Sequence, residues 1–420
     1  MCIQSNSTKV GMLENWRQFS LLVLVNAFVG AMVGMERTIL PAIAEQEYKM
    51  VAHTAILSFI IVFGLSKALT NYFAGRFSDI YGRKIILVTG WLIATPVPFL
   101  LMWAPSWNWV LLANLFLGVS QGLTWSTTVI MKIDLAGPKN RGLAMGINEF
   151  AGYLAVGIAA FATGWIAENY GLSPEPYYMG VIFVLVGLLL STVYIRETHQ
   201  HAKHEASLHP LHQNTEAPSQ RTIFWRTTLH DRNLSSASQA GLVNNLNDGM
   251  AWGLFPLVFA SAGLSLIQIG WLAAIYPSVW GVCQLFTGAL SDKIGRKWLI
   301  VVGMWVQALG IGVIASTLLF RTYVVGAILL GVGTAMVYPT LLATIGDVVN
   351  PSWRASAVGV YRLWRDLGYA VGAIISGVTS DLLGMTYALW LIVGLTFLSG
   401  MLVALRMRET LNFKTAQHKT

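Results

Sequence analysis

The chain has 420 residues, of which 55% are hydrophobic and only 11% are charged. A typical soluble protein carries about 25% charged residues, so this composition excludes a soluble two-domain protein and a disordered one. The net charge of +8 raises nucleic acid as a partner. However, the basic residues lie in short loops between apolar runs, which favours membrane lipid instead. The sequence therefore predicts an all-α, polytopic integral membrane protein.

Apolar segments long enough to cross a bilayer recur along the whole chain, since a spanning helix needs about 20 residues. The first follows an N-terminal stretch with no cleavable signal pattern, so we expect it to be retained. We predict twelve transmembrane helices, at 19–43, 51–73, 85–104, 109–131, 142–167, 178–195, 238–260, 268–290, 298–319, 322–346, 356–380 and 386–405.

Lys and Arg residues are distributed very unevenly between the two sides of these spans. The even-numbered loops and the two termini hold 21 of the 27, whereas the odd-numbered loops hold only Lys49 and Arg321. Because basic residues are retained on the cytoplasmic side, we expect both termini in the cytoplasm. The expected location is the plasma (inner) membrane.

The two halves of the chain are related by a repeat of constant spacing. Several residues recur 213 positions later: Gly75 as Gly288, Asp79 as Asp292, Gly82 as Gly295, Arg83 as Arg296, Lys84 as Lys297, Asp134 as Asp347, Arg141 as Arg354 and Gly164 as Gly377. Such a parallel duplication points to alternating access at the interface of the halves. We expect six-helix bundles at 1–196 and 238–420, joined by a cytoplasmic linker at 197–237.

The linker contains five histidines: His199, His201, His204, His209 and His212. A histidine tract can bind metal. No carboxylate or cysteine spacing completes a ligand set here, so we favour a flexible, solvated linker and predict no metal site.

The segment from Gly75 to Lys84 and its echo from Gly288 to Lys297 resemble the loop motif of the major facilitator superfamily. The resemblance implies two pseudo-symmetric six-helix bundles that work as a monomer, without a cofactor, on a small-molecule substrate. It also implies that the motif latches the cytoplasmic side shut in the outward-facing state.

The gating residues that this resemblance and the repeat indicate are Gly75, Asp79, Gly82, Arg83, Lys84 and Arg141, with Gly288, Asp292, Gly295, Arg296, Lys297 and Arg354. Asp79 and Asp292 can pair with Arg83 and Arg296, respectively. We expect Gly75 and Gly288 to allow close helix approach and Gly82 and Gly295 to permit a tight loop. Arg141 and Arg354 are the expected partners across the seam.

Three acidic residues inside the spans are candidates for proton coupling: Glu36, Asp248 and Glu149. Charged groups inside a membrane are costly and therefore functional or paired. The alternative is a static ion pair, Glu36 with Arg37 or Asp248 with Arg365.

A polar stripe in the eleventh span supplies further candidates, because Arg362, Arg365, Asp366 and Tyr369 recur at helical spacing. These arginines can bind a carboxylate or phosphate, or be neutralised by Asp366 or Glu149. Lys67 either snorkels or lines an outer gate. The full set of substrate-cavity candidates, each of which can instead be a packing residue, is Asn26, Arg37, Gln121, Trp125, Asn244, Asn247, Trp252, Tyr276, Gln284, Tyr338, Arg362, Arg365, Asp366 and Tyr369.

The sequence predicts a secondary transporter of a small organic solute. It contains no phosphate-binding loop for an ATP-driven pump and no intramembrane catalytic motif for an enzyme; a channel or receptor is a remote alternative. Proton-coupled efflux is our first hypothesis, although no proline marks the fifth span as in many drug–proton antiporters. Proton-coupled uptake of an organic anion, favoured by Arg37, Arg362 and Arg365, is the alternative.

Replacing the motif carboxylate tests the gating interpretation. We expect Asp79→Asn to lower transport and to leave expression largely intact, because the aspartate serves gating rather than folding. Flux would be measured at matched protein levels, and unchanged flux would contradict the interpretation.

Overall fold

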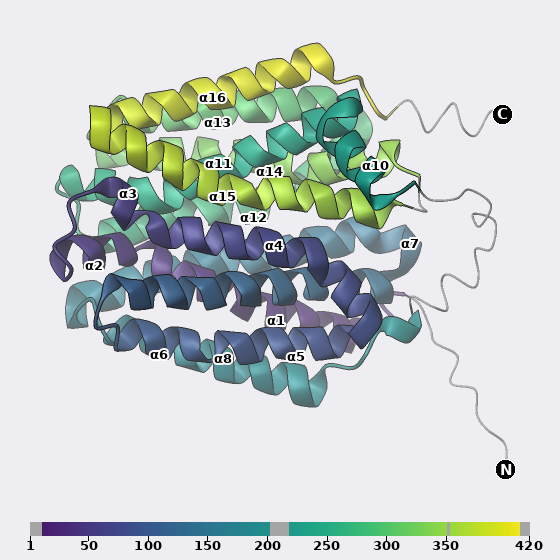
Figure 1. The fold of residues 1–420 in the computed structure, drawn as a ribbon, viewed down its shortest axis with the longest axis horizontal. Helices are drawn as coiled ribbons and strands as arrows, with labels where there is room; N and C mark the ends of the chain where they lie inside the picture. The colour runs from purple at the N-terminus through teal and green to yellow at the C-terminus, as the bar shows by residue number, and fades with distance from the viewer. Residues whose placement is uncertain (1–10, 202–217, 351–352, 412–420) are drawn as a thin grey trace.

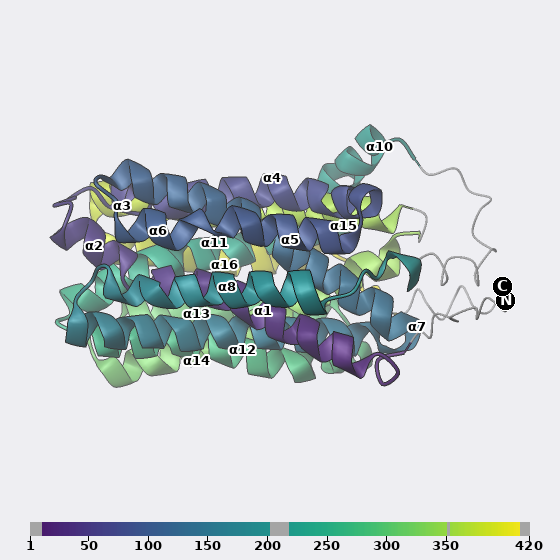
Figure 2. The same ribbon diagram turned by 90° about the horizontal axis from the view of Figure 1, so that it is seen from below.

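The computed structural model describes residues 11–201, 218–350 and 353–411, apart from the side chains of 137–142 and 355. In this part of the chain every regular element is helical and none is a strand. The long helices lie side by side along one axis (Figure 1). Figures 1 and 2 show α10 at one end of the molecule and α2 and α3 at the other, which we call the α10 end and the α3 end.

The first half holds the elements α1 (Trp16–Arg37), α2 (Leu40–Gln46), α3 (His53–Ile56), α4 (Ser58–Tyr81), α5 (Arg83–Ala94), α6 (Pro96–Met102), α7 (Trp107–Tyr170), η1 (Glu175–Tyr177), α8 (Tyr178–Leu189) and η2 (Leu190–Tyr194). The first and third predicted spans are each divided into two helices at a proline, Pro41 or Pro96, which lies in the first turn of α2 or α6. Proline fits a first turn because it has no N–H group to satisfy.

Helix α7 contains both the fourth and the fifth predicted spans. The Trp125 indole donates a hydrogen bond of 3.0 Å to Glu149, 24 residues further along the same helix. A straight helix would separate these residues by about 36 Å. The chain therefore folds back on itself within α7, so that its two arms lie antiparallel.

The second half holds the elements α10 (Gln220–Trp225), η4 (Arg226–His230), α11 (Arg232–Ser261), α12 (Leu266–Ile294), α13 (Lys297–Ala315), α14 (Phe320–Val348), α15 (Arg354–Leu383) and α16 (Met385–Arg406). The expectation of a wholly flexible linker at 197–237 is wrong for its described C-terminal part. Ile223 is buried there, and Thr228 accepts a hydrogen bond from Trp364 at 3.0 Å. Apolar side chains in this segment pack it against α15, and Asp231 caps α11.

Helices occupy all twelve segments predicted to span the membrane. Among the described residues, eight helical stretches are long and apolar enough by composition to do so. The other four predicted spans lie in α4, the first arm of α7, α11 and α15, which carry more polar side chains. These four helices therefore position most of the polar groups considered below.

The halves meet along two seams, one between α4 and α15 and one between α7 and α12 (Figures 1 and 2). The distance from an added Cβ on a seam glycine to the opposite half measures how closely the two backbones approach. In the α7–α12 seam, a Cβ on Gly164 would lie 2.7 Å from the Leu266 carbonyl oxygen, whereas one on Gly146 would come no closer than 3.8 Å to a described atom, in Leu285. This seam is tight toward the α3 end and looser toward the α10 end.

The seam that α15 forms with α4, and with α3 at the α3 end, shows the same gradient. A Cβ on Gly377 would lie 2.8 Å from Thr54 Cα, and one on Gly359 would lie 3.8 Å from the Tyr72 carbonyl oxygen. Since both seams loosen in the same direction, the halves diverge toward the α10 end.

Candidate functional site

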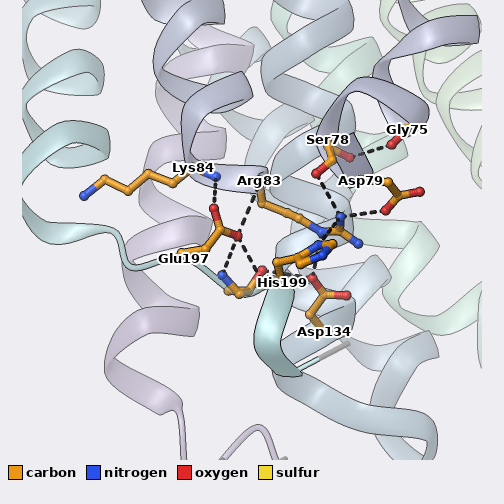
Figure 3. A network of polar contacts seen from close by, with 9 residues as sticks. Gly75, Ser78, Asp79, Arg83, Lys84, Asp134, Glu197 and His199 are labelled. Carbon is orange, nitrogen blue, oxygen red and sulfur yellow. Dashed lines mark hydrogen bonds and ion pairs between the residues drawn. The ribbon is translucent and has the colours of Figure 1, made fainter. Parts of the chain in front are cut away.

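The predicted gating loop between α4 and α5 is the centre of a polar network, drawn in Figure 3. The Arg83 guanidinium lies 2.6 Å from an Asp79 oxygen and 3.3 Å from Asp134, and it donates to the Ser78 carbonyl at 2.9 Å. The predicted contact of Asp79 with Arg83 is therefore present. The same arginine also ties α4 and α5 to the first arm of α7.

Sequence reasoning missed Glu197, which lies beyond η2 and caps the N-terminus of α5 (Figure 3). Its carboxylate accepts hydrogen bonds from the backbone N–H groups of Arg83 at 3.1 Å and Lys84 at 3.0 Å. Partial burial by itself raises the pKa of Glu197, but hydrogen bonds from four backbone N–H groups outweigh it and lower the pKa below its usual 4.5.

The second half repeats this network. Arg296 lies 2.5 Å from Asp292 and 3.1 Å from Asp347. Glu409 accepts from the N–H groups of Arg296 at 2.8 Å and Lys297 at 3.1 Å. The sequence contained a signal for both capping acids, because Arg-Glu-Thr occurs at 196–198 and again at 408–410.

The four glycines of the gating motif differ in whether the structure requires a residue without a side chain. Gly82 and Gly295 have φ values of 96° and 100°, so the tight loops require glycine as predicted. At Gly75 and Gly288, no described atom lies within 4 Å of the position that a Cβ would occupy. The expectation of close helix approach at these two is therefore wrong for this conformation, in which the halves diverge at the α10 end.

The prediction that Arg141 and Arg354 are partners across the seam stays a prediction. The Arg141 side chain lies outside the described residues. Arg354 donates to the Val349 carbonyl at 3.3 Å, within its own half. The described contacts of Figure 3 likewise join elements of one half.

Glu36 and Arg37 are buried at the C-terminal end of α1. They do not form the ion pair that was the alternative to coupling, and neither the Glu36 oxygens nor the Arg37 nitrogens have a hydrogen-bond partner among the described residues. The Arg37 Cζ atom instead lies 4.5 Å from the centre of the Trp252 ring and 4.8 Å from that of Phe63. These are cation–π contacts.

Asp248 is also fully buried, on α11. One of its oxygens accepts a hydrogen bond from the Tyr276 hydroxyl, and the other has no partner among the described residues. The predicted alternative, a pair with Arg365, does not form. Asp248 therefore retains an unused oxygen near the seam.

Within the α15 stripe, Asp366 neutralises Arg365, as the alternative to substrate binding proposed, whereas Arg362 has no ion pair among the described residues. Arg365 lies 2.6 Å from Asp366 and donates to the Tyr338 hydroxyl at 2.7 Å. Asp366 also accepts from Asn71 of α4, across the seam. Arg362 also makes a contact between the halves, because it donates to Ser126 of α7 at 3.1 Å.

Glu149 accepts from the Trp125 indole at 3.0 Å and from the Asn148 amide at 2.9 Å, and its second oxygen has no described partner. It forms no ion pair with Arg362 among the described residues. Glu149 is thus held by neutral donors of α7.

Lys67 does not snorkel to the membrane surface. Its ammonium group is buried and lies 5.1 Å from the Tyr369 ring centre, 5.3 Å from Phe63 and 5.5 Å from Trp125. Tyr369 in turn stacks on Trp252 at 4.9 Å. Lys67 and Arg37 therefore share an aromatic cluster at the junction of the halves.

Four other predicted cavity residues are held within one half. Asn26 donates to the Asn148 carbonyl at 2.7 Å, and Gln121 donates to the Val29 carbonyl at 2.7 Å. Asn247 bonds Gln307 and Thr396 at 2.9 and 2.7 Å, and Asn244 accepts from Gln307 at 3.0 Å. These contacts agree with the packing alternative for Asn244 and Asn247, because Gln307 of α13 binds both amides and Thr396 of α16 binds Asn247.

Several seam residues could have been found by applying the 213-residue repeat to the predicted ones. Gln284, which is buried with an unpartnered amide nitrogen, is the counterpart of Asn71. Asp366 is the counterpart of Tyr153, whose ring stacks on Trp280 at 3.5 Å across the seam. The internal repeat therefore contained the information needed to identify Asn71 and Tyr153 from the sequence.

Little free space remains between the halves beside Arg37 and Trp252. A cavity of about 20 Å³ lies between α1, α7, α11 and α12, lined by Arg37, Trp252, Phe255 and Tyr276 among others. That volume accommodates about one water molecule. The seam is therefore occluded here, with aromatic side chains filling it.

No cluster of three His, Cys, Asp or Glu side chains among the described residues could hold a metal ion. Of the five linker histidines, His204, His209 and His212 lie outside the described part. His199 contacts Arg83 at 2.9 Å in the network of Figure 3.

Comparison with known proteins matches nearly the whole chain to one family. The model of the Major Facilitator Superfamily matches residues 22–243 and 237–418. An uncharacterised MFS-type transporter of Methanocaldococcus jannaschii is 21% identical over 77% of this chain and 81% of its own. A second, from Salmonella typhimurium, is 21% identical over 90% and 93%. The class H tetracycline resistance protein of Pasteurella multocida is 23% identical over 69% and 71%.

The caps at Glu197 and Glu409 predict a pH-dependent contribution to stability. Because hydrogen bonding lowers these pKa values below 4.5, the contribution is full above that pH and is lost as the pH falls through the folded-state value. We expect Glu197→Gln or Glu409→Gln to cost about 1 kcal/mol at pH 7, read as a lower melting temperature in detergent. The exposed Glu47→Gln is the control, and an equal loss there would contradict the assignment.

Proposed function

The chain belongs to the major facilitator superfamily and is an integral, multi-pass membrane transporter of a small molecule rather than an enzyme, and from that premise we propose that it exports a small organic solute in exchange for protons. The proposal includes cytoplasmic termini, residence in the plasma (inner) membrane and function as a monomer. It also keeps the division into two six-helix bundles at 1–196 and 238–420 with a linker at 197–237.

The observation that carries the proposal is the pair of buried carboxylates Glu36 and Asp248. They come from opposite halves, and each has at least one oxygen without a described partner. A carboxylate kept in a water-poor interior without an ion pair is costly. Reversible protonation removes that cost, which supports these residues as the coupling acids.

Glu149 is the third coupling candidate and is weaker by the same criterion. Two neutral donors hold one of its oxygens. We therefore assign it to positioning Trp125 beside Lys67. We then expect substitution of Glu149 to change substrate affinity more than proton stoichiometry.

Exchange follows from the charge balance at the seam. When the acids are ionised, they offset Arg37 and Lys67 and can accept a polar or cationic solute. When they bind protons, that attraction disappears and the solute is released. Protons and solute thus compete for the same groups, which gives antiport.

The direction is supported by the similarity to a tetracycline resistance protein. The aromatic cluster at the seam is also suited to the apolar part of such a solute. The absence of a proline in the second arm of α7 between 142 and 167 leaves this chain without one feature of many drug–proton antiporters.

A second candidate, uptake of an organic anion together with protons, is favoured by one specific observation. All three Arg37 guanidinium nitrogens are buried without a described hydrogen-bond partner. A substrate carboxylate or phosphate would satisfy them. In that case protonation of Glu36 and Asp248 would strengthen anion binding, and both species would move in the same direction.

Internal pH in proteoliposomes with a trapped dye distinguishes the two candidates. After pooled solutes are added outside, we expect the lumen to become alkaline, because entering solute exchanges for protons. Acidification would instead establish symport.

The coupling acids are tested in the same assay. We expect Glu36→Gln or Asp248→Asn to reduce the solute-driven pH change by at least about tenfold, because the amide can neither release a proton nor attract the solute as the carboxylate does. Glu14→Gln, at an exposed position, is the matched control. An undiminished pH change in both variants would remove Glu36 and Asp248 from the mechanism.

A further inference from the structure

At the α3 end, one carboxylate of the second half holds the start of a helix in the first half. Asp381, near the end of α15, accepts hydrogen bonds from the backbone N–H groups of His53 at 2.5 Å and Thr54 at 2.9 Å. It also accepts from the Thr54 hydroxyl at 2.6 Å and lies 3.0 Å from His53 Nδ1. One side chain thus joins the halves through several polar contacts.

The reciprocal contact is made at the other seam. Glu168, near the end of α7, accepts a hydrogen bond of 2.8 Å from the backbone N–H of Leu266, the first residue of α12. Here the acid belongs to the first half and the helix to the second. The positive end of a helix favours an anionic side chain at this position.

The internal repeat relates the two contacts residue for residue. Glu168 and Asp381 are 213 positions apart, as are His53 and Leu266. Each acid also follows a glycine by four residues, Gly164 or Gly377, which places glycine and acid on one helix face. Both glycines are the close-approach points described above, where a Cβ would collide with the opposite half.

Ordinary helix capping does not account for this arrangement. Ser265 already caps α12 from within its own half, with a capping box to Gln268. The cap at Glu197 likewise stays within one half. Glu168 and Asp381 differ in reaching across the seam, at the end where the halves are tightest.

We propose that Gly164 with Glu168 and Gly377 with Asp381 form a paired gate that closes the α3 end of the transporter. In each element, the glycine lets the opposing backbone approach and the acid accepts hydrogen bonds from backbone N–H groups at the start of the opposing helix, two for Asp381 and one for Glu168. Opening toward this side requires both caps to break together, since the repeat places one on each seam. The gate requires neither a particular solute nor a particular direction of transport.

The strength of the contacts suits a gate that must open in every cycle. The Asp381 side chain is about a quarter exposed, and Glu168 is exposed. Water can therefore replace the broken hydrogen bonds, which keeps the cost of opening modest. A fully buried charge pair in the same place would lock the end shut.

A cysteine accessibility experiment tests the gate in the full-length protein in intact cells. The reporter is Ala251→Cys, which lines the small cavity beyond the gate, in a background carrying Cys2→Ser and Cys283→Ala. A membrane-impermeant thiol reagent is applied outside, where the Lys and Arg distribution predicts the α3 end. We expect the double variant Glu168→Ala, Asp381→Ala to be labelled at least about tenfold faster than the background.

Two sets of controls separate gating from loss of folding. Asp231→Ala removes a carboxylate cap that stays within one half, on Asn233 and Leu234, and we expect it to leave labelling unchanged. Gly164→Ala and Gly377→Ala should accelerate labelling by wedging the seams, whereas Gly394→Ala, with no described atom within 4 Å of the added carbon, should not.

Melting temperatures verify that each variant is folded. Unchanged labelling in a folded double variant would overturn the gate. Equal acceleration by Asp231→Ala or Gly394→Ala would also overturn it. Solute-driven pH changes in the Glu36 and Asp248 variants test the proposed function separately, because failure there leaves the labelling result unaffected.

Discussion

A charge inside a membrane must find a partner or bear a large desolvation cost, and the centre of this protein is organised by that constraint. Arg365 and Asp366 satisfy each other and are joined to α4 through Asn71. Glu36 and Arg37, although adjacent in sequence, are left without hydrogen bonds to the described residues. The free-energy cost of burying charged groups is thus concentrated where the two halves meet, and a solute or a proton bound there can reduce it.

The same chemistry, a carboxylate on a helix start, serves two opposite purposes. Glu197 and Glu409 cap helices of their own half and support networks around Arg83 and Arg296. Glu168 and Asp381 cap helices of the other half. Caps within a half make it rigid, whereas caps between halves can be broken by relative motion. In the proposed mechanism, rigid halves and separable seams together allow the motion to occur at the interface.

The hydrophobic pattern predicted the helices, and the constant spacing of glycines and charged residues predicted the repeat, because both are properties of the sequence itself. It did not predict that α7 would contain two spans or that 220–237 would be helical, since a local pattern does not show what a segment packs against. Asn244 and Asn247 were cavity candidates by residue type and position in the span, with packing as the alternative, and in the structure both make hydrogen bonds to Gln307 of α13. Helix orientation decided their surroundings, and that is set by tertiary contacts.

The open space at Gly75 and Gly288 is explained by the divergence of the seams rather than by a failure of the motif. A glycine is needed where helices come close at some stage of the cycle, and these two lie at the loose end in this conformation. Gly164 and Gly377 are at the tight end and are already in contact. If the halves rock about the central aromatic cluster, closing the α10 end brings the first pair into contact as the second pair separates. One motion then requires glycines at both ends. Gly75 and Gly288 are in contact when the α10 end is closed, and Gly164 and Gly377 are in contact when the α3 end is closed.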